Sequence, residues 1–363
     1  MHLAIDVREA CRSKRTGKGQ WSYGFVTELL TRHCTVTLFT DQEIPRAWES
    51  SPQLADVRTW RGGFPWHFSS MRELQRSKDI DLYVSPTSYI VPSLIGSRFP
   101  CVPIVHDLIA FQGEPHDAFA RRVEKFTLKR AAEKCAVLCT ISAATERDLL
   151  ERYPSLSLKL RSILYAGPMR SEPLPRNPDG KTILCVGTLC PRKNQLRLIE
   201  AYAALPPALR SRTTLILAGA RGWDDEQIVE RACTTPGVEW RKYIPNEEYQ
   251  FLLSTCEIFA LPSLYEGFGM QVLDALQAGI PTLVSDRGSL PEVTADAALR
   301  VDPLSVDAIA GGLHALLTDG TLRRSLQEKA MRRALEFRWE RTVDLFLTAV
   351  RQWASIQSPR KEP

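Results

Sequence analysis

Residues 257–286 read EIFALPSLYEGFGMQVLDALQAGIPTLVSD, and they contain one complete strand–helix–strand unit. The apolar runs EIFALP and TLVSD at the two ends predict buried strands. Between them, Val272, Leu273 and Leu276 form the apolar face of a helix that packs on the sheet. Because a strand, a helix and a second strand in this order are the unit of doubly wound sheets, the stretch predicts an α/β fold with a parallel sheet.

The same alternation of short β-branched runs and longer amphipathic runs covers nearly the whole chain. In the first half it predicts strands at 3–7, 36–40, 82–86, 102–107, 136–141 and 163–167, and helices at about 20–32, 118–134 and 143–152. In the second half it predicts strands at 182–187, 214–219, 238–244, 257–262, 282–286 and 298–302, and helices from about 195, at 225–233, at 246–255 and from about 269. Three further helices are predicted at about 305–317, 321–336 and 340–356.

A proline-rich stretch divides the chain. Four prolines and Gly180 lie between Gly167 and Lys181, and they permit neither a long helix nor a central strand. We therefore predict an N-terminal Rossmann-like domain over 1–168, a linker over 169–180, a C-terminal Rossmann-like domain over 181–338, and a helix within 339–363 that packs back on the N-terminal domain. Because open parallel sheets bind ligands beyond the carboxyl ends of their strands, two such domains facing each other predict an interdomain cleft.

The composition excludes several protein classes. With 44% hydrophobic and 25% charged residues, the chain is neither disordered nor fibrous. No run of 18 apolar residues occurs and the first charges follow the first apolar stretch, so we expect a cytoplasmic protein. Nine scattered cysteines without a C-x-x-C pair predict packed, reduced thiols.

The positive charge is concentrated in the first half of the chain. Residues 1–170 carry 24 Lys and Arg against 18 Asp and Glu. This excess indicates either a solvated basic surface or peripheral contact with the inner face of the plasma membrane.

The loop before the helix of the opening stretch predicts a phosphate site. Gly267, Phe268 and Gly269 lead into the helix, whose N-terminal amides and dipole favour an anion. Asp274 lies roughly 8–9 Å from that end, a separation that suits the ribose of a nucleotide. Glu266 would point across the diphosphate toward the group on its far side. Taken singly, a capping role for Glu266 and a solvated Asp274 are the simpler interpretations.

Residues 261–292 resemble the PS-x-x-EGFG-x-x-x-x-EA-x-x-x-G-x-P-V signature of retaining GT-B glycosyltransferases, the glycosyltransferase family 4 (glycosyl transferases group 1). The sequence departs from the signature at the second acid of the family's E-x7-E pair, where it has Asp274. The resemblance implies a GT-B fold of two doubly wound Rossmann-like domains. It also implies that the C-terminal domain binds the nucleotide sugar and the N-terminal domain binds the acceptor.

A second segment, CVGTLCPRKN (185–194), resembles the VGT-x-x-PRKN donor-phosphate loop of the family. The resemblance implies that Gly187 and Thr188 line this loop, and that Arg192 and Lys193 bind the diphosphate and stabilise its charge as it leaves. Many relatives have an arginine at the position of Thr188. In this sequence Arg192 is the residue that would take over the role of that arginine. Without the resemblance, an Arg-Lys pair is an ordinary surface feature.

The N-terminal half carries two segments of the same kind. Gly17 and Gly19 in RTGKGQW resemble the TG-x-G-R-Y loop, whose amides approach the donor phosphate and the acceptor. VPIVHDL resembles the HDL strand end of the family, which implies that His106 lies close to the transferred sugar. Asp107 either orients its neighbours or contacts the ligand. A tight turn and a satisfied core histidine are the simpler alternatives.

Three weaker features remain open between two interpretations. Gly219 and Tyr243 follow neighbouring strands and would line a nucleobase pocket, or they belong to ordinary loops. Residues 59–70 form either a mobile loop that touches lipid or acceptor or a core-packing segment, through the aromatic residues Trp60, Phe64, Trp66 and Phe68. The Asp79–Asp81 pair imitates a D-x-D motif but precedes its strand, so we expect no catalytic metal and no cofactor.

The resemblance implies a retaining, metal-independent hexosyltransferase that uses no protein nucleophile. The leaving diphosphate itself would help to deprotonate the acceptor, and domain closure would exclude water. We expect GDP-mannose as donor, with UDP-, ADP- and dTDP-sugars as alternatives, and a glycan or lipid-linked glycan of surface polysaccharide or lipopolysaccharide biosynthesis as acceptor. No nucleic-acid partner is expected. A GT-B nucleotide-sugar epimerase and a non-catalytic nucleotide-sugar-binding subunit remain alternative functions.

Overall fold

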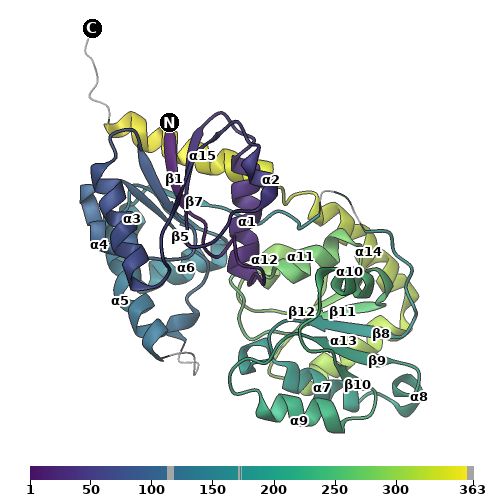
Figure 1. The fold of residues 1–363 in the computed structure, drawn as a ribbon. Coiled ribbons are helices and arrows are strands. Elements are labelled where there is room, and N and C mark those ends of the chain that lie inside the picture. Colours follow the sequence, from purple (N-terminus) through teal and green to yellow (C-terminus); the bar gives the residue numbers. More distant parts are fainter. Residues whose placement is uncertain (113–117, 171, 173, 358–363) are drawn as a thin grey trace. The chain divides into compact units, whose positions relative to one another are not determined.

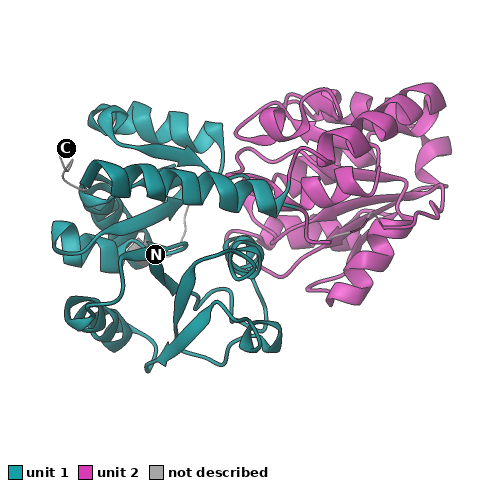
Figure 2. Cartoon of the chain, turned by 90° about the horizontal axis from the view of Figure 1, so that it is seen from above, with its two compact units in different colours: residues 1–167, 338–363 teal, residues 168–337 magenta. Residues whose placement is uncertain are grey.

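A computed structural model shows two parallel β-sheets, each in its own compact unit. The structure describes residues 1–112, 118–170, 172 and 174–357. The first unit contains residues 1–167 and 338–363, and the second contains residues 168–337 (Figure 2). Residues 171 and 173 of the expected linker, and residues 358–363 of the expected C-terminal segment, lie outside the described residues.

The first unit is built on a seven-stranded parallel sheet with the order β3-β2-β1-β4-β5-β6-β7 (Figure 1). The strand order reverses between β1 and β4, which is where such sheets bind ligands. Ile5 pairs with Leu38 on one side and with Val84 on the other, and all three side chains are buried. The strands are β1 (His2–Asp6), β2 (Thr35–Thr40), β3 (Leu54–Thr59), β4 (Leu82–Ser85), β5 (Cys101–Val105), β6 (Leu138–Thr140) and β7 (Arg161–Ile163).

Helices cover both faces of this sheet. They are α1 (Gly17–Leu29), α2 (Arg46–Glu49), α3 (Phe64–Arg76), α4 (Ile90–Ile95), α5 (Ala118–Lys134), α6 (Ala143–Arg152) and α15 (Trp339–Gln357), with the 3₁₀ segments η1 (Gly96–Arg98), η2 (Ile109–Phe111) and η3 (Pro154–Leu158). The C-terminal helix α15 packs against α1 and β7. Its first residue, Trp339, is seated against two glycines, since a Cβ on Gly24 or Gly167 would lie 2.3 or 2.6 Å from the indole.

Several elements of the first unit differ from the sequence prediction. Helices α2 and α4 were not predicted, and the strand predicted at 163–167 is observed as β7, at Arg161–Ile163. The strand β3 was not predicted, and residues 59–70, predicted as a loop or core-packing segment, contain the start of α3. Trp66 is fully buried, and Trp60 packs against the same core as Phe39, so core packing is the correct interpretation for both tryptophans. Phe64 and Phe68 of α3 instead remain exposed.

The second unit is built on a six-stranded parallel sheet with the order β10-β9-β8-β11-β12-β13. Its strands are β8 (Thr182–Val186), β9 (Thr214–Ala218), β10 (Val238–Trp240), β11 (Ile258–Leu261), β12 (Thr282–Ser285) and β13 (Leu299–Val301). Its helices are α7 (Gln195–Ala203), α8 (Pro207–Arg210), α9 (Glu226–Thr234), α10 (Asn246–Thr255), α11 (Met270–Gln277), α12 (Leu290–Thr294), α13 (Val306–Thr318) and α14 (Gly320–Ala334). The strand order of this sheet reverses between β8 and β11.

The described part of segment 168–180 runs along the second unit. The Asn177 and Asp179 amides donate to the Ser254 and Thr255 carbonyls at 2.9 and 2.8 Å, and the Arg176 guanidinium donates to the carbonyl of Gly279 at 3.1 Å. These bonds attach the proline-rich segment to its own unit over much of its length. Within the described residues, none of the helices combines the length and hydrophobicity that crossing a bilayer requires. Seven of the nine cysteines are buried, as expected for packed thiols.

Candidate active site

The loops after the neighbouring strands β8 and β11 bring three charged side chains together. Arg192 and Lys193 lie in the 3₁₀ segment η4 (Pro191–Lys193), and Glu266 lies in the loop that leads to α11. The Lys193 Nζ donates to Glu266 Oε1 at 2.6 Å, and an Arg192 nitrogen lies 3.2 Å from Glu266 Oε2. Arg192 also donates to the Tyr265 carbonyl at 2.7 Å. The structure thus joins the two segments that the sequence singled out separately.

This cluster is nearly buried and carries an excess of positive charge. The side chains of Arg192, Lys193 and Glu266 are 10%, 7% and 8% exposed. Burial opposes ionisation of Glu266, but Lys193 and Arg192 outweigh it and hold the pKa of this carboxyl below its usual value. The Ser263 hydroxyl donates to the same Oε1 at 2.6 Å. Two cations and one carboxylate leave one net positive charge, which favours an anionic ligand.

Two glycines allow the backbone to pack closely around Lys193. A Cβ on Gly187 would lie 3.1 Å from Lys193 Cε, so the lysine chain lies against this glycine. A Cβ on Gly219 would lie 2.0 Å from the Gly187 carbonyl oxygen, which only glycine permits. Thr188 is exposed beside them, and its carbonyl accepts a hydrogen bond from Gln195 at 3.0 Å. Gly187, Thr188, Gly219 and Lys193 therefore gather at one edge of the sheet.

Asn194 holds this loop in place, a role that the sequence analysis did not assign. Its backbone is left-handed (φ 61°), a conformation that asparagine tolerates better than most residues. Its buried side-chain amide donates to the Pro262 and Pro303 carbonyls at 2.9 and 2.7 Å. It thereby ties the residue after Lys193 to the loops that follow β11 and β13. The sequence signals were its place at the end of the PRKN motif and its position directly before a helix.

The N-terminal end of α11 lies directly after Glu266. Gly269 caps the helix in a left-handed conformation (φ 91°), and Gly267 precedes it. The Phe268 side chain is buried and packs edge-on against Phe337, with 5.7 Å between ring centroids. Phe268 can therefore offer a ligand only its backbone. Ser289 anchors the loop by donating from its hydroxyl to the Glu266 carbonyl at 3.0 Å.

Asp274 of α11 has two partners within its own unit. The Tyr249 hydroxyl donates to Oδ2 at 2.8 Å, and the Met169 amide donates to Oδ1 at 3.4 Å. Burial raises the pKa of Asp274 to about 6, while both hydrogen bonds act in the opposite direction. A ribose would have to share this carboxylate with Tyr249, a residue that no sequence pattern had singled out. Tyr243, beyond β10, is half exposed.

In the first unit, an ion pair connects the two predicted site segments. Lys18, in the first turn of α1 between Gly17 and Gly19, lies 3.3 Å from Asp107. His106 is buried, and its Nε2 donates to the Pro86 carbonyl at 2.7 Å. Burial, with a smaller contribution from Lys18, lowers the pKa of His106 to about 3, so the ring is neutral at physiological pH.

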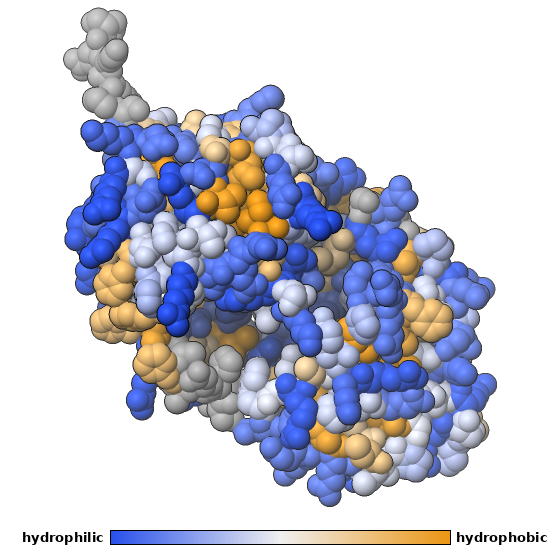
Figure 3. Space-filling view, viewed as in Figure 1, coloured by the Kyte–Doolittle hydropathy of each residue, from blue (hydrophilic) through white to orange (hydrophobic). Residues whose placement is uncertain are grey.

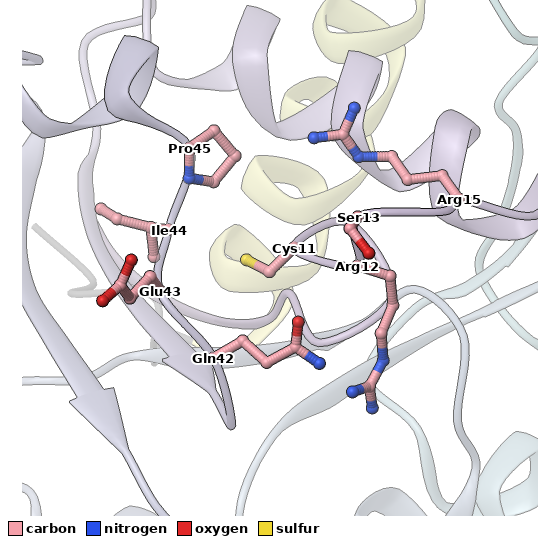
Figure 4. A pocket seen from close by; sticks show the side chains of 8 residues that line it. All are labelled: Cys11, Arg12, Ser13, Arg15, Gln42, Glu43, Ile44 and Pro45. Atoms are coloured by element: carbon pink, nitrogen blue, oxygen red, sulfur yellow. The ribbon is translucent and has the colours of Figure 1, made fainter. Parts of the chain in front are cut away.

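The first unit has a pocket of about 530 Å³ that sequence reasoning missed. Figure 4 shows the side chains that line it. The pocket is lined by the loops after β1 and β2, through Cys11, Arg12, Ser13, Arg15, Gln42, Glu43, Ile44 and Pro45. Arg12 pairs with Asp41 at 3.1 Å, and Arg15 stacks on the ring of Tyr23 at 3.9 Å. Burial raises the pKa of the Cys11 thiol to about 11, so it is protonated at neutral pH. The pocket lies at the carboxyl ends of β1 and β2, on the edge of the sheet that binds ligands in such folds and next to the reversal of strand order between β1 and β4.

Comparison with known proteins identifies the family. Residues 170–333 match the family described as Glycosyl transferases group 1. O-antigen chain mannosyltransferase B of Escherichia coli is 38% identical over 281 residues, which cover 71% of this chain and 71% of that protein. The MMP alpha-(1->4)-mannosyltransferase of Mycolicibacterium hassiacum is 27% identical over 326 residues, which cover 82% of this chain and 79% of that protein.

The fold agrees with this assignment. The structure of sucrose-phosphate synthase from Thermosynechococcus elongatus matches with a TM-score of 0.78 at 18% identity, over 98% of this chain and 100% of that one. The predicted GT-B fold, with two doubly wound Rossmann-like domains, is therefore confirmed. The chain belongs to the group 1 glycosyltransferases.

Proposed function

We propose that this protein transfers mannose from a nucleotide sugar to a glycan acceptor during the synthesis of a surface polysaccharide. One observation supports the chemistry most strongly: Lys193, Arg192 and Glu266 converge beside the start of α11 in a nearly buried cluster. The choice of mannose is supported by the 38% identity to an O-antigen chain mannosyltransferase. GDP-mannose is the donor we propose.

In this proposal the diphosphate of the donor binds at the positive cluster. Lys193 and Arg192 contact the phosphate oxygens, and the amides at the start of α11 supply further donors. As the sugar–phosphate bond breaks, negative charge accumulates on the diphosphate, and these fixed groups stabilise it without reorganisation. Glu266, relieved of part of its pairing with the cations, accepts hydrogen bonds from hydroxyls of the transferred sugar and orients it.

We also propose that the reaction retains the anomeric configuration and needs no metal. GDP-mannose is an α-linked donor, and the M. hassiacum relative is named as an alpha-mannosyltransferase, so an α-linked product fits retention. The two cations and the helix start supply the charge neutralisation that a metal ion supplies in other transferases. His106 contributes as a neutral ring: with Nε2 donating to Pro86, Nδ1 is the nitrogen left to accept a hydrogen bond from a sugar hydroxyl.

For the first unit we propose acceptor binding at the carboxyl ends of its strands, including the pocket of Figure 4. The polar and cationic groups that line this pocket suit the hydroxyls and anionic substituents of a glycan. The excess of Lys and Arg in residues 1–170 would also attract the unit to the anionic inner face of a membrane. We therefore propose a cytoplasmic protein that meets a lipid-linked acceptor at that face.

The test is a transfer assay with the purified full chain, GDP-mannose and a panel of glycan acceptors. The proposal predicts a mannosylated product whose new linkage is α by NMR. Conversion of the nucleotide sugar without an acceptor would identify an epimerase instead, and donor binding without any turnover would identify a binding subunit. A thermal-shift comparison of GDP-, UDP-, ADP- and dTDP-sugars tests the donor separately, because a ligand stabilises the native state that binds it.

A further inference from the structure

Helix α5 of the first unit has two exposed phenylalanines on its outer face. Phe119 and Phe126 are 76% and 77% exposed, and their spacing of seven residues puts them two turns apart on one side of the helix. The opposite side is fixed by packing, since Leu128, Ala131 and Ala132 are buried in a core cluster. The outward direction of both phenylalanine rings therefore follows from how the helix is anchored.

Cations surround these rings. Arg122, Lys129 and Arg130 are exposed on the same outer face, and the whole helix has six Lys and Arg against two Glu. Arg130 is fixed to the neighbouring helix, because its Nε donates to the Ser93 carbonyl at 2.8 Å. We refer to Phe119, Arg122, Phe126, Lys129 and Arg130 as the α5 surface.

The neighbouring helices extend the exposed apolar area. Helices α3, α4 and α5 contact one another in this order along the sheet, and Figure 3 shows apolar side chains among hydrophilic ones over α4 and α5. Leu94 of α4 is 38% exposed. Phe64 and Phe68 of α3 are 69% and 43% exposed, and their rings are in contact at 5.2 Å between centroids. Four exposed phenylalanines therefore belong to one layer of helices.

We infer that the α5 surface docks on a lipid bilayer that contains anionic lipids. The rings would enter the boundary between headgroups and acyl chains, while the cations attract the anionic headgroups. We choose a lipid surface over a protein partner because of the charge. The helix carries six Lys and Arg against two Glu, so its exposed cations complement a continuous layer of anionic headgroups, and its rings need only the apolar layer beneath. The inference rests on the proposed function, because the lipid-linked acceptor proposed above lies in the membrane on which the α5 surface would dock.

The test is co-sedimentation of the full chain with vesicles made either of phosphatidylcholine alone or of phosphatidylcholine and phosphatidylglycerol in equal parts. We expect binding to the anionic vesicles that weakens as salt is added. Replacing two cations (R122E/K129E) should lower the partition coefficient about 25-fold or more, since each basic residue near the surface contributes about fivefold. Replacing both rings (F119S/F126S) should lower it about tenfold and leave the residual binding more sensitive to salt.

Matched controls come from the second unit. Phe251 of α10 is 63% exposed on a helix that begins with Glu247 and Glu248 and carries no Lys or Arg, so F251S should bind vesicles as the parent does. Exposed Arg324 and Arg332 of α14 provide the charge control, R324E/R332E. Equal binding to both kinds of vesicle, unchanged binding of the α5 variants, or equal loss in the controls would overturn the inference. Unchanged thermal midpoints exclude unfolding as the cause of any loss.

The same variants separate this inference from the proposed function. Transfer to a water-soluble acceptor should proceed at the parental rate in F119S/F126S, because the α5 surface is not assigned to the chemistry. If the parent chain binds anionic vesicles but transfers no sugar, the proposed function fails and the lipid contact stands. If it transfers sugar but ignores the vesicles, the lipid contact fails and the proposed function stands.

Discussion

Lys193 Nζ lies 2.6 Å from Glu266 Oε1, although the two residues are 73 positions apart in the chain. The pairing exists because β8 and β11 are neighbours in the second sheet and their following loops meet at its carboxyl edge. The carboxylate holds the lysine, and with it Arg192, in position before any anion arrives. A site arranged in this way avoids ordering flexible cations at the moment of binding.

Replacing Lys193 by alanine should lower kcat about 10²- to 10³-fold, because a fixed donor to the leaving group is lost. The fold should persist, since Glu266 keeps Arg192 and Ser263 as partners. Initial rates with saturating donor measure the effect. K181A, at an exposed lysine just before β8, is the matched control and should transfer at the parental rate. A K193A enzyme with near-parental kcat would remove Lys193 from the mechanism.

Replacing Glu266 by glutamine should produce two opposite effects. Without the carboxylate, the two buried cations have no anionic partner until a diphosphate binds. GDP should therefore bind several-fold more tightly to E266Q than to the parent chain. Turnover should fall about 10²-fold or more because the sugar loses its orienting carboxylate, and the ligand-free chain should become less stable. Calorimetric titration with GDP, together with kcat, measures both effects. Weaker GDP binding in E266Q would show that Glu266 does not compete for the cations.

The stability of the chain should depend on the ionisation of Asp274. Its pKa of about 6 in the folded chain exceeds the ordinary value of 3.8, so the folded state binds more protons than the unfolded state between these values. The contribution of Asp274 to the free energy of unfolding is therefore fully present below about pH 4, and it is lost as the pH rises through about 6. D274N cannot ionise. Its unfolding free energy relative to the parent should rise by about 1–3 kcal/mol between pH 5 and pH 7.5.

Denaturant titrations of both chains at the two pH values test this dependence, and a constant difference between them would contradict it. The ribose role is tested separately with D274A, which should weaken GDP binding. Y249F is the companion variant, because it removes one hydrogen bond to the carboxylate and leaves the charge in place. Unaltered GDP affinity in D274A would mean that the carboxylate has only a structural role, through its hydrogen bonds with Tyr249 and Met169.

Asn194 should affect catalysis through the position of Lys193. N194G keeps the left-handed backbone but loses the bonds to Pro262 and Pro303, whereas N194A also strains the backbone by about 1 kcal/mol. Both variants should unfold at a lower denaturant concentration than the parent chain, and N194A should unfold at the lowest. Both should lose kcat about tenfold or more, with a smaller change in GDP affinity. Parental kcat in N194G, despite its lower stability, would limit Asn194 to a structural role.

The sequence predicted the regular elements where local signals were strong. The helices predicted at 118–134 and 143–152 have these bounds in the structure, the second with Ser142 as its N-cap. The strand β3 was missed because it is a half-exposed edge strand without a β-branched run. Helix α3 was missed because the Gly-Gly-Phe-Pro segment suggested a loop, although Pro65 near a helix start is a familiar signal.

The candidate site was predictable as a set of residues but not as an arrangement. Arg192, Lys193, Glu266 and Asp274 followed from motifs near strand ends. That Glu266 pairs with both cations depends on which strands are neighbours, and local sequence does not encode that order. The Tyr249–Asp274 bond and the bridges made by Asn194 are likewise tertiary contacts between segments far apart in the chain.

The central claim is that the diphosphate of the donor binds to Lys193 and Arg192 beside the start of α11. A crystal structure of the full chain with bound GDP tests it most directly. The account predicts phosphate oxygens within hydrogen-bond distance of Lys193 Nζ and the Arg192 guanidinium. A diphosphate bound elsewhere, with both cations still paired only to Glu266, would contradict it.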